Sequence, residues 1–237
     1  MGCTRGRSVF RQAMIEIPIS MTGNIGKTEF ANMFAQAAAC IRSEHQRLTE
    51  LDSIGGDGDH GTTMLRAAEQ MEDWTDTSTQ SLTDSLKAAG WRVLGVDGGA
   101  SSSLLGTFFA GMGDVVLAGD AMNCNEFAQS LQAGLRAVSR QTKARPGDKT
   151  MMDALIPAVD AVSAAAGVDK SIPNALDDAA LAAKLGADST RDLVARFGRA
   201  RSLGERTRGH ADAGATSIAL IFRGFREGLE KGSDSNG

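Results

Sequence analysis

Residues 28–51 read TEFANMFAQAAACIRSEHQRLTEL, and this stretch predicts the class of the fold. Its apolar residues recur mainly at steps of three, four or seven, which places them on one face of an α-helix. These residues are Phe30, Met33, Phe34, Ala37, Ile41, Leu48 and Leu51. Thr28 precedes them and is the expected N-cap. The stretch therefore predicts an amphipathic helix that begins near residue 28.

The rest of the chain repeats this helical pattern. Further helices are expected over 62–74, 81–95, 101–112, 126–140, 150–166, 173–186, 188–198 and 214–230. Asn125 is the expected N-cap of the helix over 126–140. Alternating strand patterns are almost absent, and the chain contains no tyrosine. We therefore expect an all-α protein.

A single domain is expected over residues 27–231, because no repeat or low-complexity linker interrupts the helical pattern. Residues 1–26 are expected to form a disordered N-terminal extension, in which Met21 is an alternative start. The polar tail over 232–237 cannot bury an apolar face and is expected to be disordered.

Composition argues against several classes of function. The chain has 25 Lys and Arg against 29 Asp and Glu, and this net charge of −4 gives no electrostatic reason to bind nucleic acid or an anionic membrane. No apolar run reaches the roughly 18 residues that a membrane span needs. Cys3, Cys40 and Cys124 are far apart, so neither a disulfide framework nor a zinc site is indicated. We therefore expect a cytoplasmic protein.

Two familiar motifs are matched only in part. GNIGKT (23–28) follows the apolar stretch MIEIPIS (14–20) as a P-loop follows a strand, but the first glycine of the Walker pattern falls on Met21. An EF-hand loop that began at Asp57 would need an acid or amide at its fifth position and a glutamate at its twelfth. Those positions hold Gly61 and Ala68. Neither a P-loop nor an EF-hand is expected.

The segment LDSIGGDGDHGTTM (51–64) combines three aspartates with four glycines. Asp57 and Asp59 flank one glycine, and Asp52 lies at the end of the first long helix. Carboxylates this close repel one another unless a cation neutralises them. Mg²⁺ takes such oxygen ligands and often shares its coordination shell with substrate phosphates. The segment predicts a magnesium site, with a solvated and capped turn as the alternative.

Two expected helix starts lie in glycine-rich sequence. HGTTM (60–64) directly follows the acids and offers free backbone N–H groups and two hydroxyls to an anion. In GVDGGASSSLLG (95–106), the glycines allow close approach of a ligand, and Ser101 to Ser103 supply hydroxyls at the start of the next helix. Two helix N-termini beside an acidic cluster would suit a diphosphate or triphosphate.

Two more segments contain candidate site residues. PGDKTMMDAL (146–155) places Lys149 and Thr150 near a helix start. GRARSLGERTRGHADAGATS (198–217) places His210 beside Asp212 in a glycine-rich loop, which favours a site role for both. The arginines of this segment, Arg201 and Arg208 above all, are expected to form a solvated basic face.

These motifs, in this order, resemble those of the L subunit (the nucleotide-binding domain) of dihydroxyacetone kinase. The resemblance runs from about residue 28 to 230 and rests on GDGDHG, GGAS, PGDKTM and GRA…LGER…GH.D.GATS. It implies an antiparallel eight-helix barrel that holds ADP or ATP at one end through two Mg²⁺ ions. It also implies a separate K subunit that binds the ketone covalently through a histidine.

The resemblance assigns roles to particular residues of this chain. The family's metal-binding aspartates fall on Asp52, Asp57 and Asp59. Its nucleotide-contacting positions fall on His60, Gly61, Thr62, Thr63, Ala100, Ser101, Met151, Arg199, Asp212 and Gly214. Arg199 and His210 are the candidate catalytic residues, with Arg199 as an additional cation at the nucleotide.

The chain departs from the family pattern at three places. Ser102 and Ser103 stand where a Gly-Pro pair is common, and Ala213 replaces a proline. An aromatic residue commonly follows Arg-Ala-Ser in the family, whereas this chain has Arg201 and Ser202 after Ala200. Because the changes near residue 201 lie where a partner or substrate would be recognised, a kinase subunit for a four-carbon ketose such as erythrulose is an alternative.

The sequence leaves the partners and the source of the phosphoryl group open. A K subunit is expected as the partner, and a homodimer is expected. A phosphotransferase-system protein could rephosphorylate bound ADP in place, or ATP could exchange. A non-catalytic regulatory subunit that senses nucleotide is the remaining alternative.

Overall fold

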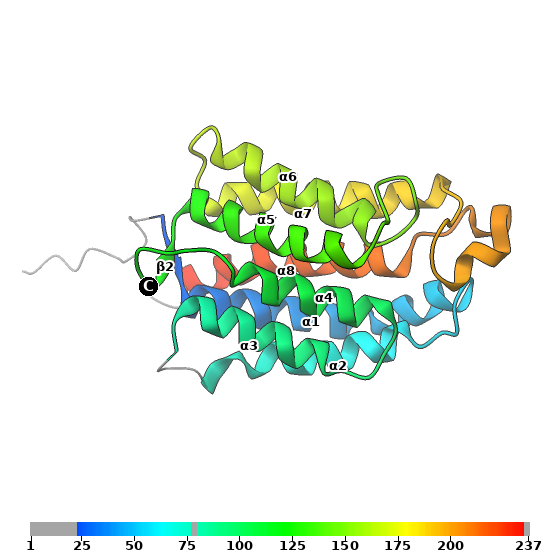
Figure 1. Cartoon of the computed structure of the whole chain (residues 1–237), viewed down its shortest axis with the longest axis horizontal. Helices are drawn as coiled ribbons and strands as arrows, with labels where there is room; N and C mark the ends of the chain where they lie inside the picture. Colours follow the sequence, from blue (N-terminus) through cyan, green and yellow to red (C-terminus); the bar gives the residue numbers. More distant parts are fainter. Residues whose placement is uncertain (1–22, 77–79, 235–237) are drawn as a thin grey trace, which may run out of the picture.

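The computed structural model describes residues 23–76 and 80–234, and within them eight α-helices lie side by side along the long axis of the molecule (Figure 1). They are α1 (Lys27–Ser53), α2 (His60–Glu72), α3 (Leu82–Leu94), α4 (Ala100–Met112), α5 (Cys124–Gln141), α6 (Met152–Ala166), α7 (Ile172–Ser189) and α8 (Ala213–Asp234). The described residues also form three 3₁₀ segments, η2 (Asp73–Asp76), η3 (Thr190–Asp192) and η4 (Arg199–Thr207), and two short strands, β1 (Ile25–Gly26) and β2 (Ala121–Met122). The predicted all-α class is confirmed.

Successive helices run in opposite directions, so all four even-numbered helices begin at the same end of the molecule. Each helix packs against the next in the sequence, and α8 packs against α1. Long connections gather at the end where the even-numbered helices begin, and the pair of strands lies at the opposite end (Figure 1). This up-and-down order places four helix N-termini around one site. The barrel geometry stays a prediction.

The apolar stripe of α1 forms part of the core, as its spacing predicts. Phe30, Met33, Phe34, Ala37, Ile41 and Leu48 are buried, whereas Leu51 is only half-buried. The Phe34 ring lies 4.8 Å from that of Phe109 on α4 and 5.4 Å from that of Phe225 on α8, centroid to centroid. Burial of one such side chain contributes about 1.5–3 kcal/mol. None of the described helices combines the length and apolar character required to cross a membrane.

Two predicted N-caps were wrong, and the capping geometry shows why. The helix α5 begins after Asn123, whose side chain accepts from the Glu126 N–H at 2.9 Å while the Glu126 carboxylate accepts from the Asn123 N–H. This reciprocal pair satisfies two donors, so Asn123 replaces Asn125 as the cap. The N-cap of α1 is Gly26 rather than Thr28, and its N–H donates to the Glu29 carboxylate at 2.8 Å.

The helix expected over 188–198 was also wrong. The helix α7 continues to Ser189, η3 follows, and residues 193–198 are not helical. Their N–H groups bond to distant parts of the chain: Ala195 donates to Thr207 Oγ1 at 3.0 Å and Arg196 to the Asp148 carbonyl at 3.1 Å. These tertiary bonds replace helical ones and carry the segment across the end of the bundle.

The two ends of the chain differ from their expected boundaries. Ile25 and Gly26 fall within the expected extension, yet Ile25 is buried and the two residues pair with Met122 and Ala121 in an antiparallel ladder. The helix α8 continues to Asp234, into the expected tail. The rest of the extension (1–22), which includes MIEIPIS, and the rest of the tail (235–237) lie outside the described residues.

Candidate functional site

A cavity of about 410 Å³ opens at the end of the bundle where the even-numbered helices begin. Its volume lies in the range of about 300–1,000 Å³ that small-molecule sites occupy. Four connections supply its walls: those between α1 and α2, between α3 and α4, between α5 and α6, and between α7 and α8. Every motif that the sequence singled out therefore contributes to one cavity.

Three carboxylates form one wall of this cavity. Ligand atoms of Asp52, Asp57 and Asp59 all lie within 4.8 Å of one another. Asp52 comes from the last turn of α1, and the other two lie on the connection that follows. Gly58 between them has a φ of +75°, a left-handed conformation that favours glycine. The sharp turn at Gly58 lets a segment of eight residues present three acids to one point.

The electrostatics of the acidic wall favour the arrival of a cation. Desolvation and the neighbouring charge of Asp57 raise the pKa of Asp59. Desolvation also raises the pKa of Asp57, but the hydrogen bond and charge of Arg199 outweigh it and hold that pKa below its usual range. Arg199 forms an ion pair with Asp57. The mutual repulsion among the carboxylates is what a bound divalent ion would relieve.

The N-termini of four helices, α2, α4, α6 and α8, face the cavity. The N-cap residues of the first three are Asp59, Gly99 and Met151, and none of them makes a side-chain capping bond. Asp212 precedes α8, and its carboxylate accepts from the Ala215 N–H at 2.7 Å. Thr150 Oγ1 accepts from the Met152 N–H at the start of α6, so α4 has the most open start. Its free N–H groups and the dipoles of the four helices create a positive field, which suits an anion such as phosphate.

His60 is held rigidly beside the acids. Its backbone N–H donates to Asp52 Oδ2 at 3.3 Å, and its Nε2 lies 2.8 Å from Ser217 Oγ on α8. The residue is buried, and desolvation lowers the pKa of the imidazole. A neutral His60 ring therefore joins the starts of α2 and α8.

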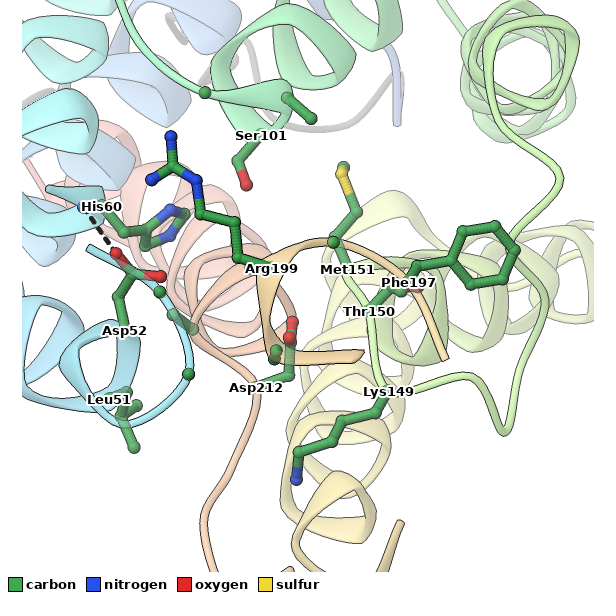
Figure 2. Close-up of a pocket in the computed structure, with 18 of the residues that line it drawn as sticks. Leu51, Asp52, His60, Ser101, Lys149, Thr150, Met151, Phe197, Arg199 and Asp212 are labelled. Carbon is green, nitrogen blue, oxygen red and sulfur yellow. Dashed lines mark hydrogen bonds between the residues drawn. The ribbon is translucent and has the colours of Figure 1, made fainter. Parts of the chain in front are cut away.

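The opposite side of the cavity is apolar. Figure 2 shows Asp52 and His60 on one side and Phe197 on the other, with Met151 between them. Leu104 of α4 also lines the cavity. The site is thus divided into a polar part, suited to phosphates and metal ions, and an apolar part, suited to a flat aromatic base.

Most of the predicted site residues line this cavity. They are Asp52, Asp57, Asp59, His60, Thr63, Ala100, Ser101, Met151, Arg199, His210, Asp212 and Gly214. Gly61 and Thr62 do not. Gly61 packs against the His45 carbonyl and Thr49 of α1, where a Cβ would clash, and Thr62 is exposed in the first turn of α2.

Other lining residues received no role from the sequence. Phe197 fell within the helix wrongly expected over 188–198, so its placement over a cavity had no signal in the periodicity. Lys149 and Thr150 were noted only for their position near a helix start. Lys149 is buried at 6% exposure, and a lysine is rarely buried without a partner.

Comparison with known proteins identifies the family of the chain. The model of the DAK2 domain matches residues 54–227. The chain belongs to the DAK2-domain family. A relative in this family, the "PEP-dependent dihydroxyacetone kinase, ADP-binding subunit DhaL" of Escherichia coli, is 34% identical over 201 residues, which cover 84% of this chain and 96% of the relative. The predicted resemblance to the L subunit is confirmed.

Longer members of the family share this domain. The L-erythrulose 1-kinase of Mycolicibacterium smegmatis is 36% identical over 196 residues, which cover 81% of this chain but 34% of the relative. The crystal structure of the dihydroxyacetone kinase from C. freundii in complex with AMP-PNP and Mg²⁺ matches 96% of this chain with a TM-score of 0.65 and 25% identity. This chain spans 38% of that protein's length. The DAK2 domain thus occurs both as a separate subunit and as part of a longer kinase.

Proposed function

We propose that this chain is the ADP- or ATP-binding and Mg²⁺-binding subunit of a dihydroxyacetone-type kinase, with the helices α1 to α8 as its nucleotide-binding domain. The observation that carries the proposal is the meeting of the three aspartates with uncapped helix N-termini in one cavity. Relatives that are subunits of dihydroxyacetone kinases support it.

The donor set fits magnesium. Asp52, Asp57 and Asp59 offer six carboxylate oxygens, and oxygen ligands are those that Mg²⁺ prefers. No histidine or cysteine belongs to the cluster among the described residues, so the softer transition metals have less to bind there. We propose that these three aspartates hold two Mg²⁺ ions.

The uncapped helix starts would bind the phosphates. N–H groups at Ala100 and Ser101 lie at the start of α4, and the Ser101 hydroxyl adds a donor. Bound Mg²⁺ would neutralise charge on the phosphate oxygens. The protein's own contribution is to hold the transferring group in a fixed orientation with preorganised donors. Arg199 would add a positive charge at the same place.

The other lining residues would hold the nucleoside. Met151 and Phe197 offer apolar surface to the base, and Asp212, Gly214 and His210 complete the wall beside them. We propose catalytic roles for Arg199 and His210. His210 is exposed, so its ring is accessible from outside the cavity.

We propose that the acceptor is a small ketose held by a separate K subunit. Within residues 23–76 and 80–234, the recognisable motifs are accounted for by the nucleotide and metal site, and no second group of residues stands out to capture a ketone. Either dihydroxyacetone or a four-carbon ketose fits the proposal, because relatives of both kinds share the domain. We also propose that the subunit forms a homodimer and that a phosphotransferase-system protein rephosphorylates its ADP, with exchange of ATP as the alternative.

A coupled assay of ADP release tests this function. The purified chain is mixed with ATP, Mg²⁺ and either dihydroxyacetone or erythrulose, with and without a K-type subunit. We expect turnover only with the partner, because the attacking hydroxyl must be held in line with the phosphate, and proximity of this kind contributes about 7–11 kcal/mol. Turnover by the chain alone would show an internal ketose site. Tight Mg-ADP binding with no turnover under any combination would favour a regulatory subunit.

A further inference from the structure

Lys149 is a buried lysine whose ammonium faces neither solvent nor a carboxylate partner. Its Nζ donates to the Thr190 carbonyl and to the His210 carbonyl, each at 2.5 Å. No carboxylate lies within ion-pair distance of this ammonium in the described ranges 23–76 and 80–234. Burial of an ammonium is costly unless hydrogen bonds compensate it, so the two carbonyl bonds are what hold this side chain inside the protein.

The backbone around Lys149 is built to point this side chain inward. Lys149 has a φ of +60°, a conformation that few residues other than glycine adopt. The buried carboxylate of Asp153 stabilises the turn, because it accepts from the Gly147 N–H at 2.5 Å and from the Thr150 N–H at 2.7 Å. The connection between α5 and α6 is therefore held in one conformation on both sides of Lys149.

The residues that Lys149 reaches are themselves linked to the site. Thr190 is fully buried, and its Oγ1 accepts from the Asp212 N–H at 2.8 Å. One ammonium thus joins the connection that carries Met151, the turn at Thr190 and the connection that carries His210 and Asp212. Burial lowers the pKa of the Lys149 ammonium, and the charges of Asp212 and Asp153 oppose that shift.

The direction and the bonds of the side chain argue against a role as a phosphate ligand. Figure 2 shows Lys149 extending away from Ser101 and from the guanidinium of Arg199, two residues of the polar part of the cavity. Two of its three N–H donors are already used by the carbonyls. Lys149 therefore contributes to the cavity through the segments that it connects.

We propose that Lys149 is a positioning residue that ties the connection between α5 and α6 to both ends of the connection between α7 and α8, and so fixes Met151, His210 and Asp212 around the nucleotide cavity. The proposal rests on the proposed function for its effect on ADP. The structural part of the proposal can be tested without nucleotide. It states that the Lys149 ammonium, on another connection, fixes the segment 209–212.

The test compares Lys149→Met with Lys143→Met. Methionine keeps the length of the side chain and removes the donors, and Lys143 is an exposed lysine of the same connection. Calorimetry should show that Lys149→Met binds Mg-ADP about 10–100-fold more weakly than the wild type, the range that loss of outer-shell partners costs at metal sites. Lys143→Met should bind Mg-ADP as tightly as the wild type. Hydrogen exchange without nucleotide should accelerate at residues 190–193 and 209–212 and stay unchanged in α1 and α4.

Two outcomes would overturn the proposal: unchanged exchange at 209–212 in folded Lys149→Met, or an equal acceleration throughout the chain, which a purely structural role would give. If Lys149→Met does not fold, Thr190→Val replaces it, because valine keeps the shape and removes the hydroxyl that accepts from the Asp212 N–H and donates to the Ala187 carbonyl. Local acceleration at 209–212 in Thr190→Val supports the linkage, and its absence overturns it. A wild-type chain that does not bind Mg-ADP would reject the proposed function, and the exchange measurement would still decide the role of Lys149.

Discussion

The two ends of the helical bundle differ in how the N–H groups at their helix starts are satisfied. At the end with the two strands, α3, α5 and α7 begin behind Ser81, Asn123 and Ser171, and each of these side chains accepts from an N–H of the first turn. At the cavity end, α2, α4 and α6 begin behind residues that make no such bond. Unpaired N–H groups are a cost at any helix start. The contrast is sharpest at α4. Asp52, Thr150 and Asp212 each accept one N–H at the starts of α2, α6 and α8, whereas among the described residues no side chain accepts from the start of α4, which is left for a ligand.

Removal of one carboxylate at the cavity end should give the largest effect. We expect Asp59→Ala to weaken Mg-ADP binding by at least about 100-fold, beyond what loss of outer-shell partners costs at metal sites, because the diphosphate and the remaining acids then repel each other. Asp120→Asn is the control, since Asp120 lies at the opposite end, where it pairs with Lys27 at 2.9 Å and accepts from the Leu82 N–H. Its Mg-ADP affinity should equal that of the wild type.

Calorimetry in EDTA completes this test. If the metal ions bridge the acids and the diphosphate, chelation should abolish ADP binding to the wild type. An ADP affinity that is unchanged in EDTA would reject the metal site. Equal losses of Mg-ADP affinity in Asp59→Ala and Asp120→Asn would show that the binding site is not confined to the cavity end.

Ligand binding should stabilise the protein through the cavity end. A ligand that binds only the folded state at 100 times its Kd adds about 2.7 kcal/mol to the free energy of unfolding, which raises the Tm by roughly 5–10 °C for a chain of this size. We expect this shift with Mg-ADP and almost none with magnesium and AMP. Equal shifts with both nucleotides would place the binding energy in the apolar part of the cavity rather than in the uncapped helix starts.

Asp212 caps α8 at the cavity end, and its titration should be visible in stability. Burial raises the pKa of Asp212 to about 6, above its ordinary value of 3.8. A folded-state pKa above the unfolded value contributes stability that is fully present below about pH 4 and is lost as the pH rises through 6. At about 1.4 kcal/mol per pH unit, and discounted for partial exposure to the cavity, this loss is about 2 kcal/mol.

Urea unfolding in EDTA from pH 4 to 7 measures this difference. Asn does not titrate, so the free energy of unfolding of Asp212→Asn should not fall in this way. Relative to the wild type it should therefore rise by about 2 kcal/mol between pH 4 and pH 7. A constant difference between the two proteins would show that Asp212 is ionised throughout. Its carboxylate would then resemble a solvent-facing cap of the kind found at the opposite end.

The sequence predicts the helices and the acidic cluster for the same reason, since both depend on residues that are close along the chain. Apolar spacing predicts the eight long helices, and Asp52, Asp57 and Asp59 lie within eight residues of one another. The two N-caps were misplaced by two residues within local sequence, at Gly26 and Asn123. The larger failure came where distant partners decide. Residues 193–198 bond to Asp148 and Thr207 instead of forming a helix. The partners of Lys149 lie 41 and 61 residues away, so its role has no local signal.

The smallest effects should come from substitutions at the helix starts. These substitutions compare the two ends of the bundle most directly. Asn123→Ala removes the capping bond of α5 and should lower the free energy of unfolding by about 1 kcal/mol, with no change in Mg-ADP affinity. Ser101→Ala is its counterpart at the start of α4, where the hydroxyl has no hydrogen-bond partner within the described part of the chain. Its stability should stay within about 0.5 kcal/mol of the wild type.

The Mg-ADP affinity of Ser101→Ala should instead fall roughly tenfold, as expected for one charge-assisted hydrogen bond worth about 1.5 kcal/mol. Urea unfolding and calorimetry should therefore give opposite results for the two variants. Asn123→Ala should lose stability and keep its Mg-ADP affinity, whereas Ser101→Ala should keep its stability and lose affinity. If Ser101→Ala lowered stability and left affinity unchanged, the hydroxyl would act as an ordinary part of a helix start. The missing side-chain cap at the start of α4 would then carry no information about a ligand.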